Sequence, residues 1–263
     1  MKHPIKTWTL RLMATGLLVA ALLFAIILNP GLVYAHKTTY KHLTIYHDRP
    51  LSPTLIDKFN QAAALVAASS VHNPKLTLDI CLHDNSVYPQ LMQSLRGPAF
   101  AWGFYNKVVL QGTAHVDSNY VELNGYRWNM TQLLAHEMTH CYQFNQLGFW
   151  NSKPIAPIPN WKWEGYAEYV SRQNTDQKDL SKNLARLMET DESQWGVKFS
   201  DHTITPRAYY DHWTLVQYCL EVKQMNYLQM LADTTRESSI RAEMMCWFNR
   251  PEILSTPSPI QNR

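Results

Sequence analysis

The chain has 263 residues, 46% of them hydrophobic and 17% charged, which suits one large folded domain or two closely packed lobes and excludes a disordered tail. Its 24 Lys and Arg outnumber its 21 Asp and Glu only because residues 1–35 contain three basic side chains and no acidic one. The rest of the chain has a net charge near zero, which speaks against a nucleic-acid partner.

The N-terminal segment has the pattern of an export sequence. A short basic stretch with Lys2, Lys6 and Arg11 precedes an uncharged apolar run over residues 12–28. The sequence "NPG" at residues 29–31 ends that run. Basic and apolar stretches in this order are typical of a signal peptide. A run of about 17 apolar residues is also at the lower limit of the length that spans a bilayer.

The residues after the break fit a cleavage site, because Val33 and Ala35 occupy the positions where small residues are preferred. The sequence therefore predicts that residues 1–35 are either a signal peptide cut after Ala35 or an uncleaved anchor that attaches the chain to a membrane through residues 12–28. Under both alternatives the protein is exported, and the rest of the chain is secreted or lies on the extracytoplasmic face of the membrane.

Residues 36–255 are predicted to form the folded domain, and its first part mixes strands with helices. In "LSPTLIDKF", Ser52 can act as an N-cap and Pro53 suits the first helical position. Alternating polarity with β-branched and aromatic residues predicts the strands. In chain order the predictions are a strand over residues 41–48, a helix over 51–70, a strand over 75–84, a short helix over 86–95 and a strand or hairpin over 99–112.

From Asn129 onward the pattern is helical. Asn129 and Gln132 form a capping-box pattern at the start of a helix that Gly148 can end. A proline-containing loop over 149–160 is followed by predicted helices over 160–173, 178–192 and 206–224, one or two more over 226–248, and a loose tail over 256–263. The sequence thus predicts an α+β architecture, in which a lobe with a small mixed sheet and helices and a mostly helical C-terminal lobe enclose a cleft.

The stretch "LLAHEMTHCYQF" places His136 and His140 four residues apart in the first of these helices. On an α-helix this spacing corresponds to about 400° of rotation and about 6 Å of rise, so both imidazoles project from one face. Two neutral imidazoles placed in this way can take adjacent corners of a zinc tetrahedron. Glu137 follows His136 by about 100° and can accept a proton from a water molecule that the metal activates. The alternative is a polar helix face without a metal.

A third ligand must come from another element, and "WKWEGYAEY" presents Glu164 and Glu168 four residues apart on the next predicted helix. One carboxylate can bind the metal while the other orients a ligating histidine. A metzincin would need glycine and histidine where this chain has Gln143 and Gln146, so the spacing excludes that class.

At these residues the chain resembles the gluzincins, in particular the peptidase-MA-like zinc metallopeptidases, and more distantly the aminopeptidase N and thermolysin families. The resemblance covers about residues 100–225 and depends on the two motifs "HEMTH" and "WEGYAEY". It implies a zincin-like fold in which three side chains hold Zn²⁺, one glutamate is the general base and another acid orients a ligand. The residues that match are His136, His140 and Glu164 as ligands, Glu137 as the base and Glu168 as the orienting acid.

The same relatives place a tyrosine at the start of a later helix, where its hydroxyl binds the oxyanion. Tyr209 is the best match here, Tyr210 is the second, and His202 or His212 could donate a hydrogen bond equally well.

One departure concerns the strand beside the zinc. Aminopeptidase N enzymes carry a G-x-M-E-N segment there, whose acid grips the free amine of the substrate, whereas "GPAFAWGFYN" at 97–106 has no acid. The departure favours an endopeptidase or another cleavage mode. The strand itself, over residues 99–110, could pair with an extended peptide by β-addition.

Two rival functions stay open. One is a cell-surface module that keeps the zincin fold and captures peptides without catalysis, and the other is a domain whose metal serves stability alone. A peptide or protein is the expected substrate of the peptidase and the expected ligand of the peptide-capture module. The cysteines, Cys81, Cys141, Cys219 and Cys246, allow three disulfide pairings or remain as buried thiols.

Overall fold

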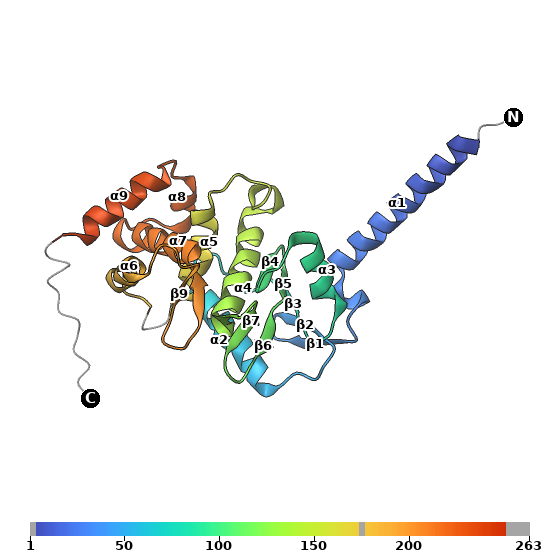
Figure 1. Ribbon diagram of the computed structural model, residues 1–263, viewed down its shortest axis with the longest axis horizontal. Helices are drawn as coiled ribbons and strands as arrows, with labels where there is room; N and C mark the ends of the chain where they lie inside the picture. The colour runs from blue at the N-terminus through green and yellow to red at the C-terminus, as the bar shows by residue number, and fades with distance from the viewer. Residues whose placement is uncertain (1–3, 174–176, 251–263) are drawn as a thin grey trace.

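Five strands of the N-terminal half form a mixed sheet with helices, and a mostly helical part follows it, which confirms the predicted α+β architecture (Figure 1). This computed structural model describes residues 4–173 and 177–250, so the predicted tail over 256–263 lies outside the described residues. The sheet contains β1 (His36–Tyr40), β2 (Leu43–His47), β3 (Leu78–Cys81), β4 (Ala101–Phe104) and β5 (Lys107–Leu110), with α2 (Pro53–Ala67) and α3 (Val87–Arg96) between strands. The sequence patterns predict all of these elements except β1.

The strand order β1-β2-β3-β5-β4 places β4 at one edge of the sheet. The inner strands β2, β3 and β5 run parallel, while β1 and β4 are antiparallel to their neighbours. All four residues of β5 are buried, as expected for a strand covered on both faces. In β4 only the first residue is buried, so this edge strand stays accessible on one side.

A second, three-stranded antiparallel sheet leads into the motif helix, and the sequence patterns predict no strand there. It consists of β6 (Thr113–His115), β7 (Tyr120–Leu123) and β8 (Tyr126–Asn129). Its strands have only three or four residues each, too few to show a clear alternation of polarity. The β7–β8 turn does have a local signal, because Asn124 and Gly125 both adopt a positive φ, 53° and 80°, as a two-residue hairpin requires.

The second half is mostly helical, as predicted. Its elements are α4 (Met130–Leu147), the short turn η2 (Phe149–Asn151), α5 (Asn160–Ser171), α6 (Leu180–Glu189), a hairpin of β9 (Gly196–Lys198) and β10 (Ile204–Pro206), α7 (Arg207–Gln217), η3 (Tyr218–Val222), α8 (Tyr227–Ala232) and α9 (Glu237–Phe248). The hairpin is not predicted by the sequence patterns. The single helix expected over 206–224 is also wrong in detail, because after Gln217 the chain changes to a π-helical turn.

The helix α4 lies between the sheet and the helical part, and 15 of its 18 residues are buried. Its contact with β4 depends on Gly103, where a Cβ atom would lie 2.2 Å from the backbone oxygen of Glu137. Its contact with α5 belongs to the same apolar core, which contains Leu134 and Tyr166. The two predicted lobes therefore share one core around α4.

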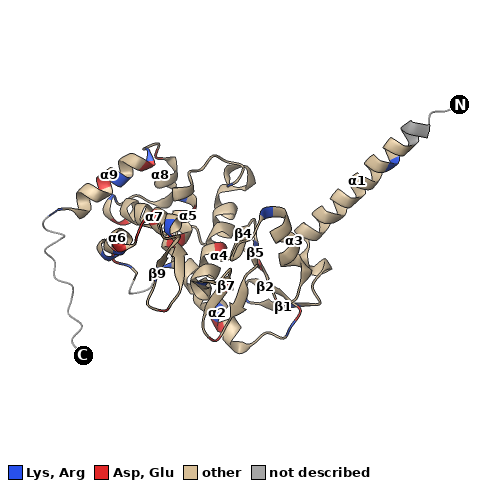
Figure 2. Cartoon of the chain, in the orientation of Figure 1, with Lys and Arg blue, Asp and Glu red and all other residues tan. Residues whose placement is uncertain are grey.

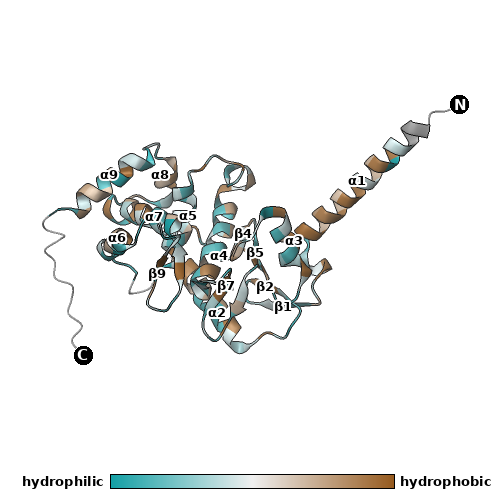
Figure 3. Cartoon of the chain, viewed as in Figure 1, coloured by the Kyte–Doolittle hydropathy of each residue, from teal (hydrophilic) through white to brown (hydrophobic). Residues whose placement is uncertain are grey.

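The N-terminal helix α1 (Pro4–Leu28) projects away from the folded domain (Figure 1). Residues 12–28 carry no charged side chain, and Figures 2 and 3 show this part of the helix as uncharged and mostly hydrophobic. The apolar span Trp8–Leu28 is long enough to cross a membrane. An exposed apolar helix at this end is consistent with a signal sequence or a membrane anchor.

The four cysteines are free thiols, so none of the three disulfide pairings is present in the part of the chain that the structure describes. Cys81, Cys141 and Cys219 are buried, and Cys246 is exposed. Burial raises the pKa of the three buried thiols, which keeps them protonated and unreactive.

Candidate metal centre

The two histidines and the glutamate of the "HEMTH" motif are all buried on α4. His136, Glu137 and His140 each present one ligand atom, and these atoms lie within 4.8 Å of one another. The helix begins where predicted, because the side chain of Asn129 accepts a hydrogen bond from the backbone N–H of Gln132 at 3.2 Å. The reciprocal half of the predicted capping box is absent from this helix start, since the side-chain oxygen of Gln132 accepts a hydrogen bond from Arg172 instead.

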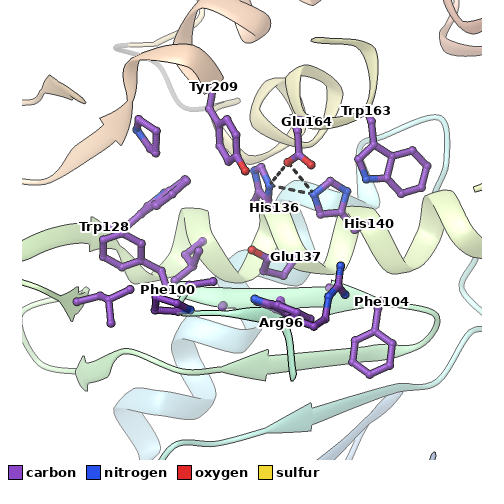
Figure 4. Close-up of a pocket in the computed structure, with 18 of the residues that line it drawn as sticks. Arg96, Phe100, Phe104, Trp128, His136, Glu137, His140, Trp163, Glu164 and Tyr209 are labelled. Atoms are coloured by element: carbon purple, nitrogen blue, oxygen red, sulfur yellow. Dashed lines mark hydrogen bonds and ion pairs between the residues drawn. The ribbon is translucent and has the colours of Figure 1, made fainter. Parts of the chain in front are cut away.

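Glu164 reaches both imidazoles from α5 and forms a triangle with them (Figure 4). The Nε2 atoms of His136 and His140 are 3.0 Å apart, and Oε2 of Glu164 lies 3.3 Å and 3.2 Å from them. Zinc bonds of about 2.0–2.1 Å in a tetrahedron place neighbouring ligand atoms about 3.3 Å apart. The three atoms therefore fit three corners of such a site, and two nitrogens with one carboxylate are the donors of a catalytic zinc.

The charges at the triangle favour a cation. Burial alone would lower the pKa of His136, but the carboxylates of Glu164 and Glu168 outweigh it and raise that pKa to about 10. Burial would likewise raise the pKa of Glu164, yet the two imidazoles hold it well below its usual value. The buried carboxylate of Glu168 and the partly buried carboxylate of Glu164 share one imidazole and thus form a site for positive charge, which a divalent cation satisfies.

The outer nitrogen of His136 faces a second acid. Its Nδ1 lies 3.2 Å from Oε1 of Glu168, without the alignment of a hydrogen bond. Glu168 is fully buried, and Nε of Arg172, one helical turn further along α5, donates to its other oxygen. Burial would raise the pKa of Glu168, but the Arg172 guanidinium and His136 outweigh it and hold that pKa below its ordinary value. Glu168 thus stays ionised and can orient the imidazole.

A glutamine performs the same task for His140. Nδ1 of His140 lies 2.7 Å from Oε1 of Gln143, and the Gln143 amide donates to the hydroxyl of Tyr227 and to the carbonyl of Trp163. Because the amide nitrogen is occupied as a donor, Oε1 must accept the proton of Nδ1, and Nε2 is left with its lone pair toward the triangle. The indole of Trp163 stacks on the same imidazole at 5.4 Å.

Glu137 lies beside the triangle on the side of β4 (Figure 4). Burial raises the pKa of its carboxyl, while the two histidines and the backbone N–H of Gly103 oppose this effect. A carboxylate with a raised pKa, next to a metal site and on the wall of a cleft, has the properties of a general base.

Of the four side chains considered as oxyanion donors, Tyr209 alone is among the described residues that line the cleft. Its ring lies parallel to that of His136 at 5.9 Å, and burial together with nearby carboxylates raises the pKa of its hydroxyl, which therefore keeps its proton. Tyr210 is fully buried among other residues and contacts Asn183. His202 is exposed on a turn.

The approach of α7 to α5 places Tyr209 over the site, and it depends on Gly165. A Cβ atom at this position would lie 2.4 Å from the backbone oxygen of His212 in α7. Any larger residue would therefore push α7 away from the helix that carries Glu164. Gly165, which follows Glu164 in the "WEGYAEY" motif, thus has a steric role that is independent of metal binding.

The site opens into a cleft of about 960 Å³ between the sheet and the helical part. Its lining is largely aromatic and includes Phe100, Trp102, Phe104, Trp128, Trp163 and Trp195. The guanidinium of Arg96, at the end of α3, lies over the ring of Trp102 at 3.5 Å. The predicted strand, now β4, lines one wall of the cleft with its free edge.

Two buried residues behind the predicted ligands are not found by sequence reasoning. Gln143 contacts His140, which it follows by three residues on the same helix face. Arg172 follows Glu168 by four residues, the spacing of a helical ion pair. Both spacings are visible in the sequence, but only the fold shows that the side chains are buried at the site.

Comparison of the chain with models of known protein families and with curated proteins gave no match. The site is therefore described by its own residues: a buried His-Glu-x-x-His group on a helix, of the kind found in zincins. The structure brings together the predicted ligands, base and orienting acid; their roles in binding and catalysis stay predictions.

Proposed function

We propose that this chain is an exported zinc-dependent metallopeptidase of the gluzincin type, related to the peptidase-MA-like enzymes. The observation that carries the proposal is the triangle of Nε2 of His136, Nε2 of His140 and Oε2 of Glu164, with sides of 3.0–3.3 Å. These three side chains would hold Zn²⁺.

When bound, zinc supplies a Lewis acid that activates water near neutral pH and polarises the carbonyl under attack. The carboxylate of Glu137 accepts the proton of the attacking water and passes it to the leaving amine. The hydroxyl of Tyr209, which keeps its proton, donates to the oxyanion of the tetrahedral intermediate. Glu168 and Gln143 hold the two imidazoles in place from behind.

The substrate of this proposed enzyme is a peptide or protein in extended form. The free edge of β4 lies along the cleft, where it can donate and accept backbone hydrogen bonds. Residues 101–104 contain no acid that could grip a free amine, which supports internal cleavage over removal of N-terminal residues. The aromatic lining suits apolar side chains of the substrate.

Metal analysis of the purified chain, followed by digestion of a mixed peptide library read by mass spectrometry, tests the proposal. We expect one zinc ion per chain and cleaved peptides. Glu137→Ala should retain zinc and lose cleavage, whereas Glu192→Ala, which removes an exposed acid, should change neither. Absence of stoichiometric zinc would refute the proposal. Zinc and peptide binding without cleavage would favour the peptide-capture module.

A further inference from the structure

The helix α1 leads directly into the folded domain through residues that the structure describes. Its last turn is tied to α3, because the hydroxyl of Tyr88 donates to the carbonyl of Ile27 at 2.8 Å. The chain then makes one turn, η1 (Pro30–Leu32), in which Pro30 is buried. Strand β1 begins at His36. Every residue between the helix and the sheet is therefore part of the described fold.

The segment before the predicted cleavage point supplies part of a second core cluster. Tyr34 is 8% exposed, its hydroxyl donates to the carbonyl of Leu82 at 2.8 Å, and its ring lies 5.8 Å from that of Tyr46. Ile26, Ile27 and Val33 pack against the same cluster, whose buried members are Tyr34, Tyr46, Cys81, Tyr88, Met92 and Val109. Cleavage after Ala35 would remove the tyrosine at the centre of this cluster and leave a cavity.

The backbone on both sides of the predicted cleavage point is also held. The N–H of Ala35 donates to the carboxylate of Asp48 at 2.8 Å, and β1 starts at the next residue. His36 is paired with His47 across the first two strands. A new N-terminus at His36 would carry a charge at the first position of the sheet and would lose the hydrogen bond of Ala35.

We propose that α1 is retained as a membrane anchor, and that its junction with the domain holds the α3 side of the folded domain, with the cleft, against the bilayer. The span Trp8–Leu28 has 21 residues, and a helix of this length rises about 31 Å, the thickness of a hydrocarbon core. Lys2 and Lys6 precede this span and Arg11 lies in its first turn, which places the N-terminus on the cytoplasmic side and the domain outside.

The position of α3 brings the cleft to the membrane. The N-terminal turn of α3 contacts the end of the anchor through Tyr88, and its last residue, Arg96, lines the cleft. The ten residues between Val87 and Arg96 span only about 15 Å. Figure 1 shows α3 beside the base of α1. The anchor thus fixes the height of the cleft above the lipid surface.

Exposed apolar side chains on this side of the domain suit contact with lipid. Leu32 is 63% exposed at the junction, and Val87 and Leu95 on α3 are 57% and 51% exposed. The anchor itself places these side chains close to the bilayer. Leu32 follows Leu28, the last residue of the span, by four residues, and Val87 is adjacent to Tyr88, which contacts Ile27. The occupant of this face is therefore the headgroup region of the bilayer.

The first test is the N-terminus of the full chain after expression in an export-competent bacterial host. We expect membrane-bound protein that resists alkaline extraction and has an intact mass that includes residues 1–35. Recovery of a soluble chain, or of any chain that begins after Leu28, would overturn the proposal. The result does not depend on peptidase activity.

Two variants of the full chain test the junction. Tyr34→Ala should lower the unfolding temperature of the domain by several degrees, because it opens a cavity in the second cluster. Tyr34→Phe removes only the hydroxyl that donates a hydrogen bond to the carbonyl of Leu82, and should have a smaller effect. Equal stability of Tyr34→Ala and the natural chain would contradict the integration of this segment.

Fluorescent labels on the full chain in lipid nanodiscs test the orientation. In a Cys246→Ser background, a label at Leu95→Cys should be quenched strongly by lipids that carry a nitroxide near the headgroup. A label at Met188→Cys, on α6 in the helical part, is the matched control, because Met188 is similarly exposed at 59%. Equal quenching at both positions would overturn the proposed orientation. Whether the anchor is retained is decided by the intact mass of the full chain.

Discussion

The two faces of α4 are built from different interactions, although they belong to one helix. One face is apolar: Leu134 and Met138 belong to the main core cluster, and the Sγ atom of Cys141 lies 3.4 Å from the carbonyl oxygen of Lys107 in β5. The opposite face carries His136 and His140, whose outer nitrogens meet Glu168 and Gln143. Apolar packing depends on volume and tolerates exchange of similar side chains, whereas a buried polar contact depends on one partner in one direction.

We expect substitutions on the polar face to change the chemistry of the site, and substitutions on the apolar face to change little when the side-chain volume stays constant. The largest effect is expected for His140→Ala, which removes one corner of the triangle. Metal affinity should fall by more than about 100-fold, because even loss of a residue that orients a ligand costs about 10–100-fold. Metal analysis after dialysis measures the effect. As a control, His202→Ala, at an exposed position, should retain zinc. Retention of zinc by His140→Ala would show that the metal is bound elsewhere.

Glu137→Gln separates catalysis from metal binding on the same face. The substitution removes the proton acceptor but preserves the size of the side chain, so the turnover rate should fall on the order of 10²–10⁴-fold while zinc stays bound. Peptide cleavage rates and zinc content of the same sample provide the measurement. Unchanged turnover would show that another group is the base.

Arg172→Met tests the network behind the ligands. The substitution removes the guanidinium that is paired with the buried carboxylate of Glu168 and leaves only His136 beside it, and loss of one partner of a buried pair destabilises a protein by about 3–5 kcal/mol. Denaturant unfolding gives the free energy of unfolding. In the double variant Glu168→Gln, Arg172→Met the buried charge is gone, so part of the loss should be recovered; a purely additive result would contradict the coupling.

Gly165→Ala tests the contact that positions Tyr209. Alanine has a helix propensity about 1 kcal/mol better than that of glycine, so an open position would gain stability. Here the added Cβ would lie 2.4 Å from the backbone oxygen of His212, and overpacking of this kind costs about 1–3 kcal/mol. We expect lower stability and slower turnover with zinc retained. A more stable and fully active variant would show that α7 can move without consequence.

Met138→Leu on the apolar face should have the smallest effect. Both side chains have a similar volume, and exchanges of this kind in a core cost less than about 1.5 kcal/mol. Zinc content and turnover should match those of the natural chain, because Met138 packs in the apolar core and does not line the cleft. A large loss of zinc would mean that the two faces of α4 are not independent.

Elements with strong local signals were predicted close to their observed bounds. The helix α2 begins at Pro53 after the N-cap Ser52, and α4 begins after Asn129, because capping involves residues only three apart. Strands β6 to β8 were missed, since strands of only three or four residues carry too little periodicity. The π-helical turn after Gln217 was missed because helix propensity does not distinguish it from an α-helix.

The sequence by itself determined the relation between His136, Glu137 and His140, because a single helix with 3.6 residues per turn sets their spacing. It also determined the apolar span at the N-terminus, which depends on composition alone. Only the tertiary structure decided that Glu164 completes the triangle, that Tyr209 rather than Tyr210 enters the cleft, and that the segment before His36 is part of the core. The physical reason is that these contacts join elements far apart in the chain, whose relative positions are set by packing around α4.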